Sequence, residues 1–325
     1  MRLVPISLVF LGGVSAAGGK AMRIEKPPPR EVAIPAGTFK MGLTEDKAIS
    51  ANDQCALAYF PKQAVVGQTA QGVLTDFCSE YMADLTRMTQ RDVFLDGYAI
   101  DRDEVSVVDY RRCVDAGKCE LDALVAGDER YIRGDWPMVN VTWDEAQTYC
   151  RAQGKRLPTE AEWERAAVGD GGNTDWPWGE LEQPKDFNHG QPRAITMRVI
   201  ERQLSIVPIK FFGDPDDSDG FPLLAPPGSF PWGESPFGTR DQAGNVAEWT
   251  ADAYFRDDVK RGYLGLPAAN PFRDGPIGQP KVVRGGSWRQ PGFVAKSNLR
   301  DPFNAYYDSS ARFSHVGFRC ARSLR

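Results

Sequence analysis

The sequence predicts a mixed α+β domain in which two main helices lie among short strands and long irregular segments. Thr142 and Glu145 form a capping box that begins one helix, and Thr159 and Glu162 form a second box that begins another. Beyond the second helix the chain is rich in Gly, Pro and Trp, with short β-like runs and few helical signals. This combination is typical of the α+β class.

The segment before these helices predicts short strands and one further helix. Glu31–Gly42 alternates apolar residues around a proline and a glycine, as a strand with a turn does, and Val93–Ile100 predicts another strand. Ser106 is expected to cap a helix. The polar, irregular stretch Leu43–Gln90 is expected to be an insertion, and a second insertion at 195–212 has the apolar spacing of a surface helix.

Composition limits the classes of partner. The chain has 325 residues, of which 42% are hydrophobic, and it is long enough to bury a large core. The formal net charge of −5 comes without any basic block, which argues against nucleic acid or an anionic membrane as a partner.

The first residues predict export. Arg2 precedes an apolar run, Leu3–Val14, and small residues follow, so residues 1–19 are expected to be a cleaved signal peptide. The run is too short to span a bilayer. A linker at 20–30 and one domain at 31–325 follow, and the protein is expected to be secreted or periplasmic.

The chain contains six cysteines, an even number that favours disulfides in an oxidising compartment. Cys113 and Cys119 can close a small ring around a turn at Gly117. Spacing alone leaves fifteen possible pairings for the whole set. A thiolate metal site is the competing interpretation, which the lack of a CxxC motif disfavours.

Four motifs occur in a fixed order: RLPTEAEWERAA (156–167), GNVAEW (244–249), VVRGGSW (282–288) and GFRCAR (317–322). Together they resemble the formylglycine-generating enzyme (sulfatase-modifying factor) family, which oxidises a cysteine of sulfatases to formylglycine. The resemblance implies a C-type-lectin-like fold over most of the chain after the linker. It also implies a disulfide between Cys150 and Cys320, which leaves Cys55 and Cys78 for each other.

The family's copper-binding cysteine pair is missing. Gln290 stands where the first cysteine should be and Ala295 near the second, and no cysteine lies between residues 150 and 320. Cu(I) prefers thiolate ligands, so we predict neither copper nor cysteine-oxidising activity. The two histidines, His189 and His315, are expected to be structural, because an iron site of the two-histidine, one-carboxylate type needs both on one face.

Calcium is the expected metal. Asp241 and Glu248 offer carboxylate oxygens, with the carbonyls of Gly244 and Val246 between them, and Ca²⁺ prefers six to eight oxygen ligands. The loop matches a calcium site of the resembling enzymes; the competing interpretation is a tight turn whose acids face water. The resemblance implies a second site at Asn188, the His189 carbonyl, Asp219 and the Phe221 carbonyl.

The residues around the former copper position are candidates for a ligand-binding cleft: Trp288, Arg289, Gln290, Asn298, Arg300 and Asp301. They suit a peptide, protein or glycan ligand, although Arg300 and Asp301 can equally form a surface ion pair. The preferred hypothesis is an exported, calcium-stabilised binding or accessory module. The alternative is an oxidoreductase or a maturation or tailoring enzyme with a different active site.

Overall fold

The computed structural model describes residues 30–59, 76–125, 131–191, 218–255, 265–276, 278–301 and 307–324. The predicted signal peptide, the linker before Arg30 and the predicted helix at 195–212 lie outside these residues. Within the described ranges, every helix is too short or too polar to cross a membrane.

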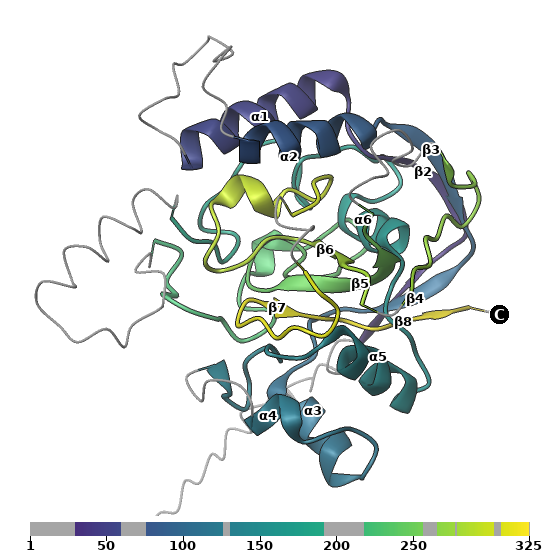
Figure 1. Ribbon diagram of the computed structural model, residues 1–325, viewed down its shortest axis with the longest axis vertical. Coiled ribbons are helices and arrows are strands. Elements are labelled where there is room, and N and C mark those ends of the chain that lie inside the picture. Colours follow the sequence, from purple (N-terminus) through teal and green to yellow (C-terminus); the bar gives the residue numbers. More distant parts are fainter. Residues whose placement is uncertain are drawn as a thin grey trace, which may run out of the picture.

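The described strands form three small sheets, of which the one with β5, β6 and β7 lies in the middle of the molecule (Figure 1). The first is antiparallel in the order β1-β4-β8, with β1 at Glu31–Ile34, β4 at Tyr98–Asp101 and β8 at Ala321–Ser323. The second pairs β2 (Gly37–Met41) with β3 (Arg91–Leu95). The third has the order β6-β5-β7, with β6 at Lys281–Arg284, β5 at Ala247–Ala253 and β7 at Val316–Gly317.

The strand expected at Val93–Ile100 is in fact two strands that belong to different sheets. The chain leaves β3 at Asp96, whose backbone N–H donates to Asn270 Oδ1 (2.9 Å), and it enters β4 at Tyr98. The turn allows one continuous stretch of sequence to serve both sheets.

The predicted capped helices are confirmed. α5 (Trp143–Ala152) begins with a capping box in which the Thr142 N–H donates to Glu145 Oε2 (2.8 Å). α6 (Glu160–Val168) begins in the same way at Thr159, and all nine of its residues are buried. α3 (Val107–Asp115) is capped by Ser106, and the short helices are α4 (Asp122–Val125), η2 (Pro231–Gly233) and η5 (Gly292–Ala295).

The region 43–90 corrects the expectation of an irregular insertion. It contains two helices, α1 (Glu45–Tyr59) and α2 (Asp76–Arg87), which the Cys55–Cys78 disulfide joins. The two helices run side by side at one end of the molecule (Figure 1). They pack into the same core cluster as Phe293, Val294 and Leu299, so they cover the segment in which the second copper cysteine was expected.

The other two disulfides also pair as expected. Cys113–Cys119 closes the small ring after α3, and Cys150–Cys320 ties α5 to the residue that precedes β8. All six cysteines are therefore bonded, and no free thiol remains.

Candidate functional site: two oxygen-rich loops and a filled cleft

The first predicted calcium loop is folded into the core. The side chains of Asp241 and Glu248 are 5% and 0% exposed. Asp241 has a left-handed backbone (φ 54°), and its Oδ2 accepts a hydrogen bond from the Gly228 N–H. Burial raises the pKa of Asp241 to about 6. The alternative of a turn whose acids face water does not describe this loop.

Two charged residues from outside this loop, which the sequence analysis did not single out, form hydrogen bonds with it. Arg319 Nη2 and Nε donate to Glu248 Oε1 (2.6 Å) and Oε2 (2.7 Å) in a fully buried ion pair. Glu104 accepts hydrogen bonds from Asn245 Nδ2 (2.6 Å) and the Val246 N–H (3.2 Å). Its pKa is raised well above the usual value, first by burial and then by the charges of Asp241 and Glu248.

The charge balance of this cluster bears on the predicted calcium ion, although no three acidic, histidine or cysteine side chains of the described residues are grouped so that they could hold a metal by themselves. Three buried carboxylates, those of Glu104, Asp241 and Glu248, face the single guanidinium of Arg319. A buried excess of negative charge is costly unless a cation or protons compensate it. The Glu248 oxygens are shared with Arg319, so Asp241 and the loop carbonyls would be the main ligands of such an ion.

The structure brings the two halves of the second predicted site together. The carboxylate of Asp219 accepts from the backbone N–H of His189 (2.8 Å) and from that of Phe221 (2.8 Å). The Asn188 amide nitrogen is held by the Leu223 carbonyl (2.8 Å). Asn188 Oδ1 is buried and has no hydrogen-bond partner among the described residues. An orphaned buried oxygen beside a carboxylate fits a hard cation.

The two loops touch each other. The Asn245 N–H donates to the Asn188 carbonyl (2.8 Å), and Asn188 Nδ2 lies 3.2 Å from Asn245 Oδ1. Gly244 has φ +77°, and a Cβ at this position would overlap the Asn188 carbonyl oxygen. Glycine is therefore required at Gly244 for the close approach of the two loops.

Gln290, which the family resemblance places at the first copper cysteine, has both of its amide atoms hydrogen-bonded. Ser287 Oγ donates to Gln290 Oε1 (2.7 Å), and Gln290 Nε2 donates to Asp301 Oδ2 (2.6 Å). Tyr307 also donates to Asp301 Oδ2 (3.0 Å), and its oxygen lies 3.2 Å from His315 Nε2. The result is a continuous polar chain that runs from Ser287 through Gln290, Asp301 and Tyr307 to His315.

His315 is the end of this polar chain. Burial, followed by the charge of Arg289, holds the pKa of His315 well below its usual value, so the ring is neutral. The Tyr307 proton goes to Asp301, and its oxygen therefore accepts from His315 Nε2–H. His315 is thus a buried, neutral ring hydrogen-bonded to Tyr307, and the structural role expected for it stays a prediction.

The cleft residues are mostly buried. Trp288, Gln290, Asn298 and Asp301 are at most 6% exposed, whereas Arg289 is exposed. The suggested surface ion pair between Arg300 and Asp301 is wrong. Arg300 instead makes two hydrogen bonds of 2.7 Å to Glu160 and lies 3.7 Å from Asp84 of α2, since the α1–α2 pair packs over this segment.

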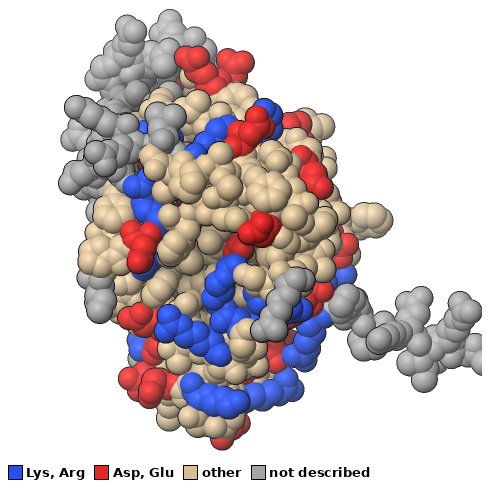
Figure 2. Space-filling view, turned by 90° about the vertical axis from the view of Figure 1, so that its right-hand side faces the viewer, with Lys and Arg blue, Asp and Glu red and all other residues tan. Residues whose placement is uncertain are grey.

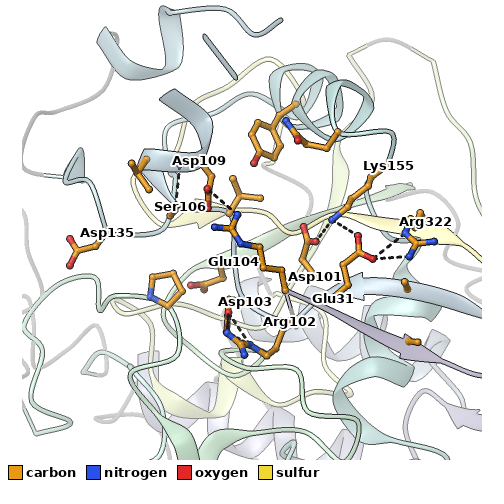
Figure 3. A pocket seen from close by; sticks show the side chains of 18 residues that line it. Glu31, Asp101, Arg102, Asp103, Glu104, Ser106, Asp109, Asp135, Lys155 and Arg322 are labelled. Atoms are coloured by element: carbon orange, nitrogen blue, oxygen red, sulfur yellow. Dashed lines mark hydrogen bonds and ion pairs between the residues drawn. The ribbon is translucent and has the colours of Figure 1, made fainter. Parts of the chain in front are cut away.

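A polar pocket of about 950 Å³ opens beside the first loop (Figure 3). Its charged groups largely neutralise one another: Lys155 pairs with Asp101 and Glu31, and Arg322 pairs with Glu31. Glu104, which contacts the first loop, also lines this pocket. The pocket and the loop therefore share one carboxylate.

Comparison with known proteins identifies the family of this chain. A family model described as "Sulfatase-modifying factor enzyme 1-like domain" matches residues 19–324. The chain is 29% identical over 318 residues to the formylglycine-generating enzyme of Bos taurus, covering 94% of this chain and 77% of that one. It is 31% identical over 188 residues to "Inactive C-alpha-formylglycine-generating enzyme 2" of Bos taurus, covering 58% of this chain and 50% of that one.

Solved structures show the same fold. PvdO from Pseudomonas aeruginosa superposes with a TM-score of 0.56 at 24% sequence identity, covering 90% of this chain and 94% of that one. The motifs, the fold and the family match over nearly the full length agree with one another. The chain belongs to the sulfatase-modifying factor enzyme 1-like (formylglycine-generating enzyme) family.

Proposed function

We propose that the protein is an exported, calcium-stabilised binding or accessory module that does not oxidise cysteine. One observation supports the proposal most: all six cysteines are bonded in pairs, so no thiolate is available. Gln290, which the resemblance places at the first copper cysteine, has both amide atoms engaged in hydrogen bonds. Copper-dependent oxidation in the family depends on thiolates, and Cu(I) binds weakly to amides and not at all to a methyl group. Three disulfides also support an oxidising compartment.

The first test is a direct assay of formylglycine formation. We expect the purified protein, supplied with copper and a thiol reductant, to leave a CxPxR sulfatase peptide unchanged by mass spectrometry. A formylglycine-generating enzyme with its cysteine pair serves as the positive control under the same conditions. Conversion of the peptide by the wild-type protein would refute the proposal.

Calcium is the second part of the proposal. At the first loop Asp241 and the carbonyls of Gly244 and Val246 would hold the ion, and at the second Asn188 and Asp219 would hold it. The orphaned Asn188 Oδ1 and the acid excess around Asp241 support this assignment. A bound calcium ion would supply fixed positive charge that joins loops with few regular hydrogen bonds.

Removal of calcium is therefore expected to lower thermal stability. A ligand present at about one hundred times its Kd stabilises the folded state by about 2.7 kcal/mol, so EGTA should lower the melting temperature measurably. Metal analysis of protein purified in calcium should find two ions per chain, and Asn188→Ala should reduce the number to one.

Asn52→Ala is the matched control for that variant. Asn52 lies on α1, is 4% exposed and also has a buried, unpartnered Oδ1. Its replacement should leave the calcium content at two ions. A melting temperature that ignores EGTA, or equal calcium content in wild type and Asn188→Ala, would contradict the calcium assignment.

A further inference from the structure

A second pocket, of about 550 Å³, lies on a different part of the molecule from the loops and the filled cleft. One wall is α5, which presents Trp143, Gln147 and Arg151 to it; residues four apart share one face of a helix. The turn between β3 and β4 and the segment 270–274 form the opposite side. The volume is within the range of small-molecule sites.

This pocket contains an accessible aromatic ring. The Phe272 side chain lines it and is 45% exposed, so its ring is accessible to a ligand. Trp143 is fixed behind it, because its Nε1 donates to the Thr250 carbonyl (2.7 Å) and Lys281 Nζ sits 4.0 Å from its ring centroid. Phe272 therefore provides the free stacking surface.

Three polar side chains each use one polar atom in a hydrogen bond within the protein and leave their second polar atom available to a ligand. Gln147 Oε1 accepts from the Leu157 N–H (3.0 Å), which leaves its Nε2 as a donor. Asp96 Oδ2 accepts from Asn270 Nδ2 (2.8 Å), which leaves Oδ1. Asp274 Oδ1 accepts from the N–H of the next residue (2.8 Å), which leaves Oδ2. Groups held in this way lose little freedom when a ligand binds.

The charges of the pocket are mixed. Arg156 is paired with Glu162 at 2.6 Å, which leaves Arg151 against Asp96 and Asp274. The Arg151 guanidinium is exposed and has no ion-pair partner in the described part of the chain. A ligand of single charge would meet the opposite sign at one wall and the same sign at another. Hydroxyl groups, which both donate and accept, match all four groups.

From this arrangement we propose that the pocket binds a neutral sugar, with its ring against Phe272 and its hydroxyls bonded to Gln147, Arg151, Asp96 and Asp274. Two donors and two acceptors surround one aromatic face. The larger pocket beside the first loop lacks such a face, because its one aromatic residue, Tyr149, is 7% exposed. α5 and β8 lie on the side of Figure 1 that Figure 2 turns to the viewer, where acidic and basic residues are interspersed.

The test is titration calorimetry of the full chain with three neutral probes: maltotriose, mannotriose and chitotriose. At least one is expected to bind with millimolar or tighter affinity. Phe272→Ala and Arg151→Ala should each weaken that binding about tenfold or more, because stacking and a bidentate donor are lost. Both variants should keep the wild-type melting temperature, since both side chains are exposed.

Matched controls exist elsewhere on the surface. Phe94, which is 39% exposed on β3, and Arg111, which is exposed on α3, do not line the pocket. Phe94→Ala and Arg111→Ala should bind the sugar as the wild type does. Failure of all three sugars to bind, or binding that survives both Phe272→Ala and Arg151→Ala, overturns the inference. The sulfatase-peptide assay probes a different part of the molecule, so its result does not affect this one.

Discussion

Replacing Arg319 by methionine is expected to lower the free energy of unfolding by about 3–5 kcal/mol, since the Glu248 carboxylate would remain buried without its partner. Arg319 also donates to the carbonyls of Arg102 (2.9 Å) and Arg240 (2.7 Å), so the variant orphans these acceptors as well. Such a loss is a large part of the total stability of a domain. Chemical denaturation measures it directly.

Two further variants make this result interpretable. Arg319→Lys keeps the positive charge but loses the planar guanidinium, so we expect a smaller decrease in the free energy of unfolding. This variant should fold even if Arg319→Met does not. Arg322→Met removes the pair with Glu31, which is 27% exposed, and should leave the denaturation midpoint nearly unchanged. Equal denaturation midpoints for the Arg319 and Arg322 variants would show that the buried ion pair contributes no more to stability than the exposed one.

The second large effect is expected for Gly244→Ala. The left-handed backbone at this position costs a non-glycine residue about 1–2 kcal/mol. The new methyl group would also displace the Asn188 carbonyl, and overpacking of this kind costs about 1–3 kcal/mol more. The two loops would separate, so the variant should lose calcium in metal analysis as well as stability.

Gly117→Ala separates the two contributions. Gly117 has a similar φ of +66°, but a Cβ there meets no atom within 4 Å. This variant should show only the backbone cost of about 1–2 kcal/mol and should retain its calcium. If both glycine variants lose equal stability and equal calcium, the contact with Asn188 does not matter.

Local signals predicted the elements that begin with caps. At Thr142, Thr159 and Ser106 a side-chain oxygen accepts from the third residue of the helix, and the residues that do this are visible in the sequence. The calcium prediction also rests on local sequence, because the family motif at 244–249 carries the ligand pattern of the first loop; it stays a prediction. The comparisons confirm the family and the fold that those motifs indicated.

The helix α1 was missed for a physical reason. The buried apolar positions of α1 are Ala48, Ala51, Cys55 and Ala58, which have helical spacing but small side chains. Small residues give almost no hydrophobic periodicity, although they allow the close packing of α1 on α2. Their burial is set by the disulfide and by the core around Phe293, neither of which a local pattern contains.

The partners of the first loop were missed because they are distant in sequence. Glu104 lies on the loop after β4 and Arg319 lies just before β8, yet both meet at the segment 241–248. Nothing in the local sequence of a charged residue states that it will be buried. The available signal was the Arg in GFRCAR itself, a charge between the two apolar residues Phe318 and Cys320.

The position of β8 has a consequence for the assembly of the fold. β4 is the middle strand between β1 and β8, and Arg319 and Cys320 immediately precede β8. A chain without residues 319–323 lacks this sheet edge, the guanidinium of the buried ion pair and the covalent link to α5 all at once. Loss of this one short segment would therefore leave the polypeptide unable to complete the sheet that joins β1, β4 and β8.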